Sequence, residues 1–208
     1  AVSLNAVSVT APNTMAAIFV DAAAATVSLS VTGGSLSGLY GVRFENTLSA
    51  STVLLDSVAV TAAGAGAAFR VLGVVTGGSI TMTNVGITAA SGLALDSASS
   101  STVAISGGTW TCTGMAAAFS GAVSGSGVTL TNAALTGSYA LFFASTVSAP
   151  LSVTSGSLTA TTNQALRFMG IVAPATTIAL SGVGPRGRQV GSYRMHEAVS
   201  VGGDPAAL

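Results

Sequence analysis

Four carboxylates in the repetitive part of the chain are the residues that could carry acid–base chemistry. They are Asp21, Glu45, Asp56 and Asp96. Sugar hydrolysis typically uses two carboxyl groups about 5 to 10 Å apart, one as acid and one as base or nucleophile. Asp21 and Asp96 each follow an apolar pair, but they lie three repeats apart, so stacked strands would separate them by roughly 14 Å. The spacing favours solvated turn residues over a catalytic pair.

Arginine, cysteine and histidine offer few further possibilities for chemistry. Arg43 and Arg70 occupy equivalent places in neighbouring repeats, and with Glu45 they predict a surface ion pair. Cys112 lies in an alternating apolar run, which predicts a buried structural thiol. His196 has no serine–aspartate constellation around it, and no Cys, His, Asp or Glu residues have metal-ligand spacing. The sequence therefore predicts no catalytic residue, no cofactor and no metal.

Hydroxyl side chains recur at alternate positions of a regular apolar pattern and form a candidate binding face. We call this set the hydroxyl face: Thr81, Thr83, Ser106, Thr129, Thr131 and Thr154. Serine and threonine hydroxyls both donate and accept hydrogen bonds, so the face could bind a glycan or a protein. Thr-x-Thr arrays on flat β-solenoids also resemble ice-binding faces. Two Thr-x-Thr pairs are present, but not in adjacent repeats, so ice binding stands as an alternative function.

The composition excludes several classes of function. Only 6% of the 208 residues are charged, the net charge is zero, and the mean hydropathy is +0.74. The uncharged stretch from Val71 to Leu95 alternates with period two and is interrupted by glycine, whereas a membrane-spanning helix needs about 20 predominantly apolar residues. Nucleic-acid binding requires a dense basic face, which is missing outside the last 23 residues. We expect neither nucleic-acid binding nor direct membrane insertion of this segment.

A Val-x-Leu-like dyad recurs every 23 to 27 residues and identifies an internal repeat. The dyads are Val2/Leu4, Val27/Leu29, Val53/Leu55, Ile80/Met82, Val103/Ile105, Val128/Leu130, Leu151/Val153 and Ile178/Leu180. Self-similarity at a fixed period is typical of solenoids. A second apolar residue follows most dyads seven positions after their start. In the second repeat it shifts to Leu36, which predicts a two-residue bulge at Gly33-Gly34.

A third apolar cluster completes each repeat, and the arginines Arg43, Arg70 and Arg167 fall within it. The clusters are Ile18/Val20, Val42/Phe44, Phe69/Val71, Leu93/Leu95, Ala117/Phe119, Leu141/Phe143 and Leu166/Phe168. Three alternating segments per repeat, separated by Gly, Ser, Asn and Asp, indicate three short strands. The predicted fold is all-β: a right-handed parallel β-helix, or β-solenoid, of about seven coils of 23–27 residues, with three short strands per coil.

Stacking of equivalent residues accounts for the low charge content. Like charges stacked about 5 Å apart repel, whereas serine and threonine ladders can form hydrogen bonds. The outward positions of the dyad strand are mostly small and polar, and we assign Ser28/Ser30 to them in the second repeat. Turn residues should stack as well. Those in one register after the dyad are Ser57, Asn84, Gly107, Asn132, Ser155 and Gly182.

The pattern divides the chain into two parts. Residues 1–184 form the predicted parallel β-helix, and residues 185–208 form a polar C-terminal tail or cap that contains His196, Glu197 and Asp204. Solenoids require polar caps over their terminal coils. The repeat pattern is already in progress at residue 1, and no signal peptide is visible. We therefore expect this chain to be a segment of a longer protein, with neighbouring coils as its immediate partners.

Two stretches carry a resemblance to a known family: ITMTNVGITAASGLAL at residues 80–95 and VTLTNAALTGSYALFF at residues 128–143. The pattern resembles long β-helical surface proteins of kinetoplastid protozoa, the dispersed gene family of trypanosomes, over roughly residues 1–182. This resemblance implies a very large, membrane-anchored protein with a proposed role in adhesion. This chain would be a piece of the ectodomain.

These observations favour a non-enzymatic structural or adhesive segment of a larger cell-surface or extracellular protein. Its extended Ser/Thr-rich face would meet a glycan or a surface or matrix protein. The alternative from another class is a carbohydrate-active β-helix enzyme of the pectate-lyase or glycosidase type. Two or three acids and an arginine gathered in one groove would favour the enzyme, and scattered acids would argue against it.

Overall fold

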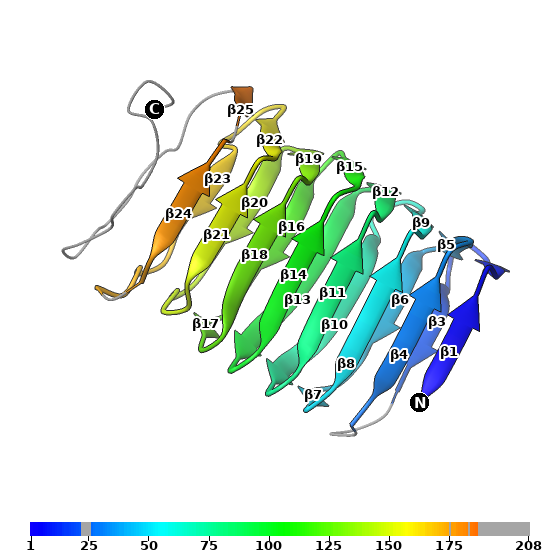
Figure 1. Ribbon diagram of the computed structural model, residues 1–208. Coiled ribbons are helices and arrows are strands. Elements are labelled where there is room, and N and C mark those ends of the chain that lie inside the picture. The colour runs from blue at the N-terminus through cyan, green and yellow to red at the C-terminus, as the bar shows by residue number, and fades with distance from the viewer. Residues whose placement is uncertain (22–25, 175, 183, 187–208) are drawn as a thin grey trace.

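The computed structural model is a parallel β-helix built from three sheets (Figure 1). It describes residues 1–21, 26–174, 176–182 and 184–186. Within these residues every regular element is a strand, and every strand pairs in parallel with its equivalent in the next coil. The predicted fold is confirmed: an all-β solenoid of about seven coils, with three strands in each coil.

Sheet A collects the first strand of every coil. Its strands are β1 (Val2–Asn5), β4 (Ser28–Thr32), β8 (Thr52–Asp56), β11 (Ser79–Thr83), β14 (Thr102–Ser106), β18 (Gly127–Thr131), β21 (Leu151–Thr154) and β24 (Ile178–Ser181). Seven of these eight strands carry the dyads as predicted, and β4 is the exception. Figure 1 shows them side by side in chain order.

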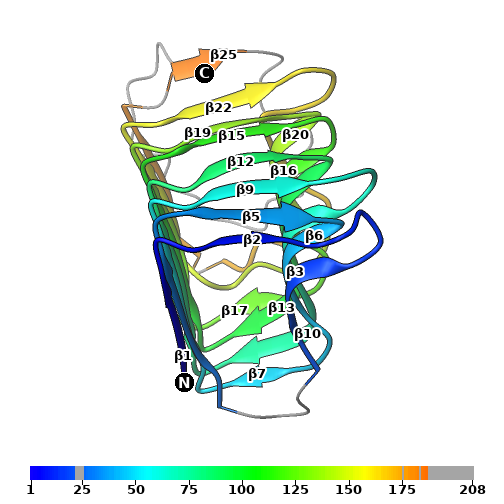
Figure 2. The same ribbon diagram turned by 90° about the vertical axis from the view of Figure 1, so that its right-hand side faces the viewer.

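Sheets B and C collect the second and third strands of each coil (Figure 2). Sheet B comprises β2 (Ser8–Thr10), β5 (Ser35–Gly38), β9 (Ala59–Ala62), β12 (Gly86–Ala89), β15 (Thr109–Cys112), β19 (Ala134–Gly137), β22 (Ser157–Ala160) and β25 (Gly184–Arg186). Sheet C comprises β3 (Ala16–Val20), β6 (Tyr40–Phe44), β10 (Ala67–Thr76), β13 (Ser91–Ser99), β16 (Met115–Phe119), β20 (Tyr139–Phe143) and β23 (Leu166–Phe168). The short strands β7 (Leu48–Ser49) and β17 (Val123–Ser124) pair with β10 and β13.

The register of the second coil differs from the prediction by two residues. Its dyad is Leu29/Val31 rather than Val27/Leu29. Leu36 then follows Leu29 by seven residues, as in the other coils, and the predicted bulge at Gly33-Gly34 does not form. The three apolar residues of this stretch alternate with polar ones, so a period of two permits either register. The turn at Gly33-Gly34 selects the register that is observed.

The same shift changes the outward residues of β4. Ser30 and Thr32 occupy the positions that we had assigned to Ser28 and Ser30, because Ser30 pairs with Ser3 and Thr32 with Asn5. The other predicted dyads and all the predicted third-strand clusters lie in the expected register. The sheets therefore stack equivalent residues directly over one another.

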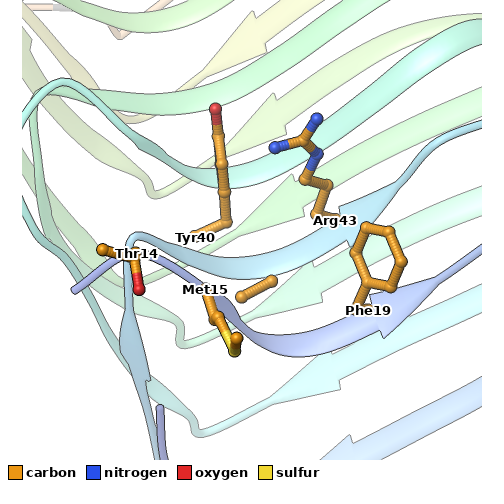
Figure 3. A pocket seen from close by; sticks show the side chains of 6 residues that line it. Thr14, Met15, Phe19, Tyr40 and Arg43 are labelled. Atoms are coloured by element: carbon orange, nitrogen blue, oxygen red, sulfur yellow. The ribbon is translucent and has the colours of Figure 1, made fainter. Parts of the chain in front are cut away.

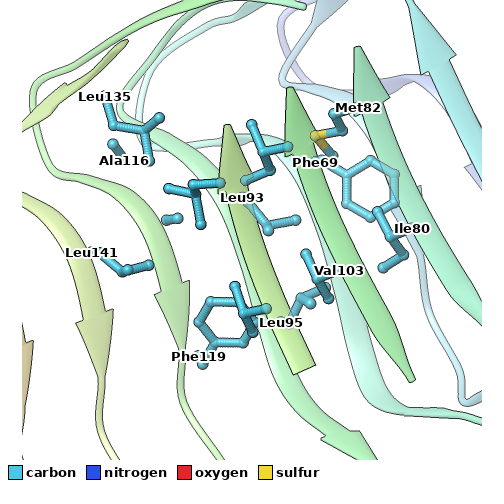
Figure 4. Packing of buried hydrophobic residues seen from close by; sticks show 14 of the residues in the cluster. Phe69, Ile80, Met82, Leu93, Leu95, Val103, Ala116, Phe119, Leu135 and Leu141 are labelled. Carbon is cyan, nitrogen blue, oxygen red and sulfur yellow. The ribbon is translucent and has the colours of Figure 1, made fainter. Parts of the chain in front are cut away.

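The core is a set of apolar columns that run along the solenoid axis (Figure 4). Trp110 pairs with Ile87 on one side and Leu135 on the other, and its side chain is fully buried. Its indole Nε1 donates a hydrogen bond to the carbonyl of Val85 at 3.1 Å, which satisfies its one polar atom. The indole is thus buried without an unpaired polar atom.

Small residues fill the inner positions where sheets B and C approach each other. One such set on sheet B contains Gly38, Ala62, Ala89, Cys112, Gly137 and Ala160. On sheet C, Gly92 makes room for the indole, because a Cβ at this position would lie 2.9 Å from Trp110 Cε3 and 2.2 Å from the carbonyl oxygen of Ala116. Bulky and small columns therefore alternate around the coil.

A column of left-handed residues forms the corner between sheets A and B. Its members have φ between 51° and 66°: Ala6, Gly33, Ser57, Asn84, Gly107, Asn132, Ser155 and Gly182. Each amide up to Ser155 donates to a carbonyl in the following coil, as from Asn84 to Ser106 and from Gly107 to Thr131. The predicted stacking of the turn residues is confirmed, and Ala6 and Gly33 extend it.

The uncharged stretch from Val71 to Leu95 is made of strands. The described part of the chain contains no helix with the length and apolar character of a membrane span. At the other end, β25 pairs with β22, so sheet B continues through Arg186. The rest of the predicted tail or cap at residues 185–208, including His196, Glu197 and Asp204, lies outside the described residues.

Candidate functional site

The hydroxyl face lies on sheet A as two columns. Thr83, Ser106, Thr131 and Thr154 are consecutive partners in β11, β14, β18 and β21. The column continues in both directions and is polar in every coil. We call it the polar column, and it contains Asn5, Thr32, Asp56, Thr83, Ser106, Thr131, Thr154 and Ser181.

The second column of the hydroxyl face is interrupted. Thr81 and Thr129 lie in coils separated by Ala104, which pairs with both. The two Thr-x-Thr pairs are therefore not adjacent, as expected from the sequence. The structure brings four of the six predicted residues into one continuous row and leaves the other two apart.

The corner between sheets A and B positions the polar column. Each member ends its strand and is followed directly by a left-handed residue of the corner. Among the described residues, the side chains of Thr83, Ser106, Thr131 and Thr154 make no hydrogen bond with one another or with neighbours, and all four are half-buried or exposed. Their hydroxyl groups are available to a partner.

A longer threonine row lies on sheet B. Thr61, Thr88, Thr111, Thr136 and Thr159 are consecutive partners over five coils. We call these residues the threonine column. Their side chains are half-buried or exposed, and the column continues to Ser37 at one end and to Arg186 at the other. The signal in the sequence is the threonine that directly follows the second apolar residue of most repeats.

Charge gathers on sheet C. With the exception of Asp56 on sheet A, the charged side chains that the structure describes lie on or directly after strands of this sheet: Asp21, Arg43, Glu45, Arg70, Asp96 and Arg167. One outward column of sheet C reads Phe19, Arg43, Arg70, Ala94, Ala118, Phe142 and Arg167. The arginines lie on the third strand of their coils, as predicted, and the register gathers them on one face.

The predicted ion pair is confirmed. Arg43 Nη2 lies 2.5 Å from Glu45 Oε1, and its guanidinium lies 4.6 Å from the centroid of the Tyr40 ring. Arg167 has a similar environment, because its Nη1 donates to the Tyr139 hydroxyl at 2.5 Å and its guanidinium lies 5.3 Å from that ring. Both arginines combine a planar cation with an aromatic face.

The aspartates are held by hydrogen bonds. Asp56 accepts a hydrogen bond from the Ser57 hydroxyl at 3.0 Å at the end of β8, as a turn residue should. Asp96 accepts from the amide of Gly73 at 3.1 Å, opposite the irregularity in β10 where the pairing with β13 shifts by one residue. Asp96 therefore stabilises a β-bulge.

Asp21 and Asp96 follow equivalent residues of sheet C, as predicted, but Asp21 also has a nearer acidic neighbour. Asp21 follows Val20, which pairs with Phe44, so Glu45 is its equivalent in the next coil. Its Oδ1 accepts a hydrogen bond from Asn46 Nδ2 at 3.3 Å. Asp21 and Asp96 are three coils apart, as expected, but Asp21 and Glu45 are neighbours. This pair joins an aspartate to a glutamate, so matching aspartates between repeats does not reveal it.

A shallow hollow of about 330 Å³ lies on sheet C next to this pair (Figure 3). It is lined by Thr14, Met15, Ala16, Phe19, Tyr40 and Arg43. Met15 and Phe19 are large apolar side chains with exposed fractions of 63% and 54%. These two side chains give the hollow a small exposed apolar surface beside the Arg43 guanidinium.

Cys112 lies in the column of small residues and is buried, as predicted. Burial raises the pKa of its thiol from 9.0 to about 12, because the thiolate would lose its hydration. Such a thiol is a poor nucleophile. In the described residues no group of three or more His, Cys, Asp or Glu side chains could hold a metal ion.

Comparisons with protein-family models, with curated proteins and with solved structures find no significant match to this chain. The class of the protein is therefore defined by its fold, a parallel β-solenoid.

Proposed function

We propose that this chain is a non-enzymatic, adhesive segment of a larger cell-surface or extracellular protein, and that the hydroxyl face on sheet A binds a glycan. The observation that carries this proposal is the unbroken polar column through Thr83, Ser106, Thr131 and Thr154. A surface protein or matrix protein is the second kind of partner for the same face. The resemblance to trypanosome surface proteins agrees with such a role.

The chemistry of the column suits a neutral, hydroxyl-rich ligand. Neighbouring strands lie about 4.8 Å apart, so the column repeats a donor and an acceptor at that interval. Short side chains lose little conformational entropy on binding. Asp56 is the one charged side chain described on sheet A, so the face offers no cations for nucleic-acid phosphates.

The rigid frame also supports a scaffold role. Each coil contacts its neighbours through three parallel ladders and a shared core. Solenoids built in this way extend by adding coils and present long surfaces. Neighbouring coils of a longer chain would lengthen the polar column. The segment would then present an extended face away from any membrane anchor.

The test is a glycan microarray with the whole chain and two triple variants. Thr83→Val, Thr131→Val and Thr154→Val together remove three hydroxyls from the polar column and keep the side-chain shape. The matched control replaces Thr88, Thr111 and Thr136 on sheet B by valine. We expect bound glycans to be lost in the first variant and kept in the control. Equal binding by both variants would contradict the proposal.

A carbohydrate-active enzyme is the second candidate, and the neighbouring Asp21 and Glu45 favour it. Equivalent positions in adjacent coils are about 4.8 Å apart, close to the carboxyl separation of retaining glycosidases. Against it, Glu45 is engaged by Arg43 and Asp21 by Asn46. Release of reducing sugar from a polysaccharide panel by the wild-type chain, abolished by Glu45→Gln, would establish the enzyme instead.

Ice binding is the third candidate, and the threonine column of sheet B favours it. Five consecutive threonines in register meet the requirement for aligned threonines better than the hydroxyl face does, and the column ends at Arg186. On sheet B, Thr109 and Thr111 supply one Thr-x-Thr pair within β15, and β9, β12, β19 and β22 have one threonine each. The row is therefore one residue wide.

A further inference from the structure

Two arginines lie directly over one another on the outer face of sheet C. Arg43 in β6 and Arg70 in β10 are partners in the parallel ladder, so their backbones are about 4.8 Å apart. Like charges at directly paired positions destabilise a sheet. The rest of the solenoid carries few charges, so this pair is an exception to the pattern that the chain otherwise follows.

The two guanidinium groups differ in their partners. Arg43 is paired with Glu45 and lies over the Tyr40 ring. Arg70 is half-buried, and its side chain has no hydrogen bond or ion pair with any other residue that the structure describes. The pair therefore leaves one cation whose charge is not neutralised by a direct partner. An anionic group bound between the two arginines would remove the repulsion.

Aromatic surface lies beside Arg43, one strand away from Arg70. Phe19 is the partner of Arg43 on the side away from Arg70, so the three residues follow one another along the outer face. Phe19 and Tyr40 line the hollow together with Arg43 (Figure 3). The phenyl ring of Phe19 is more than half exposed. A ligand here would meet a flat apolar surface at one end and a guanidinium at the other.

The acids at the rim limit the charge of the ligand. Glu45 and Asp21 lie next to the arginines at the end of β6 and β3. These two carboxylates would repel a polyanion such as a nucleic acid. They can also accept hydrogen bonds from ligand hydroxyls. The ligand that fits these surroundings has a single negative charge, several hydroxyls and one apolar face.

We propose that Phe19, Tyr40, Arg43 and Arg70 form a binding site for a sugar that carries one carboxylate, a uronic acid unit of a glycan. The carboxylate binds the guanidinium of Arg70 through paired hydrogen bonds, the geometry that arginine offers to carboxylates. The C–H face of the ring packs on Phe19 and Tyr40. The site is on sheet C and does not depend on the hydroxyl face of sheet A.

The test compares methyl glucuronide with methyl glucoside, which has the same ring without the carboxylate. Binding to the whole chain is followed by NMR titration of the protein. We expect at least tenfold tighter binding of the glucuronide. Arg70→Gln should reduce the glucuronide affinity tenfold or more and leave the glucoside unchanged, because only the glucuronide has a carboxylate to pair with the guanidinium. Phe19→Ser should weaken both sugars.

The matched control is Arg167→Gln, which removes an arginine from the same outward column at the far end of the sheet. It should bind glucuronide as the wild type does, and circular dichroism verifies the fold of each variant. Equal affinity for the two sugars, or full glucuronide binding by Arg70→Gln, would overturn the proposal. A third result would also overturn it: single-stranded DNA that competes with the glucuronide and no longer binds to Arg70→Gln. The site would then be one for polyanions.

Discussion

The ring of Phe168 lies parallel to the ring of Phe143 in the preceding coil, with centroids 5.0 Å apart and planes 8° apart. Phe119 continues the stack on the other side of Phe143 at 4.8 Å. Because paired positions of a parallel ladder place equivalent side chains over one another, the same residue type in successive coils produces a stack. The three rings therefore join coils that are distant in the sequence.

This stack predicts that alanine substitution lowers the free energy of unfolding far more at Phe143 than at the adjacent Phe142. Phe143 is buried between two rings, whereas Phe142 points outward and is half-buried against Tyr139. Phe143→Ala should lower the free energy of unfolding by about 3–5 kcal/mol. Phe142→Ala should lower it by about 1 kcal/mol or less. Urea denaturation followed by circular dichroism measures both, and similar losses would show that the inward and outward assignments of β20 are wrong.

The close packing of Gly92 against Trp110 predicts an energetic coupling between sheets B and C. A methyl group at this position would meet the Trp110 ring and the Ala116 carbonyl. Gly92→Ala should therefore cost about 1–3 kcal/mol through overpacking. Part of that loss should disappear when Trp110 is replaced by leucine, the residue at the equivalent position 135.

Gly86 is the matched control for this prediction. A Cβ at Gly86 would have no neighbour within 4 Å, and its φ is not in the left-handed region. Gly86→Ala should change the unfolding free energy by no more than about 0.5 kcal/mol. A double-mutant cycle on Gly92 and Trp110 measures the coupling, and strictly additive effects would refute it.

The Cys112 thiol should be unreactive in the folded protein. Burial raises its pKa to about 12, so almost no thiolate exists at pH 8. Alkylation by iodoacetamide at pH 8, followed by mass spectrometry, should be undetectable in native protein and complete in 6 M guanidinium on the same timescale. Fast labelling of the native chain would mean that the core opens at β15.

The raised pKa of Cys112 makes the free energy of unfolding depend on pH. The folded thiol holds its proton up to about pH 12, whereas the unfolded thiol loses it near 9.0. Above pH 9 the unfolded state therefore binds fewer protons, and the free energy of unfolding falls as the pH rises toward 12. In Cys112→Ala this contribution should vanish, which urea denaturation at pH 8 and pH 10 can measure.

The threonine column predicts where an ice-binding activity would reside. If the chain binds ice through sheet B, Thr111→Lys should abolish thermal hysteresis, because a long charged side chain breaks the small, uncharged row. Thr131→Lys on sheet A is the matched control and should retain it. Nanolitre osmometry measures the effect, and a wild-type chain without hysteresis would remove ice binding from the candidates.

The candidate sites could be predicted only in part. The hydroxyl face followed from alternation within one strand, and the Arg43–Glu45 pair followed from their spacing in one repeat. Arg43 and Arg70 occupy equivalent places in neighbouring repeats, so their pairing also followed from the sequence. The pairs Asp21–Glu45 and Phe19–Arg43 join unlike residues 24 positions apart, and the register between β3 and β6 established them.

The sequence by itself determined the fold class, the strands and the inward columns of this protein, because period-two alternation and a repeat of 23 to 27 residues permit few other ways to bury the apolar side chains. Only the tertiary structure decided the register of the second coil, where Val27, Leu29 and Val31 allow two pairings. The left-handed corner at Gly33 selected one of them. The tertiary structure also decided which charged side chains meet on sheet C, because the pairing between coils sets which side chains become neighbours.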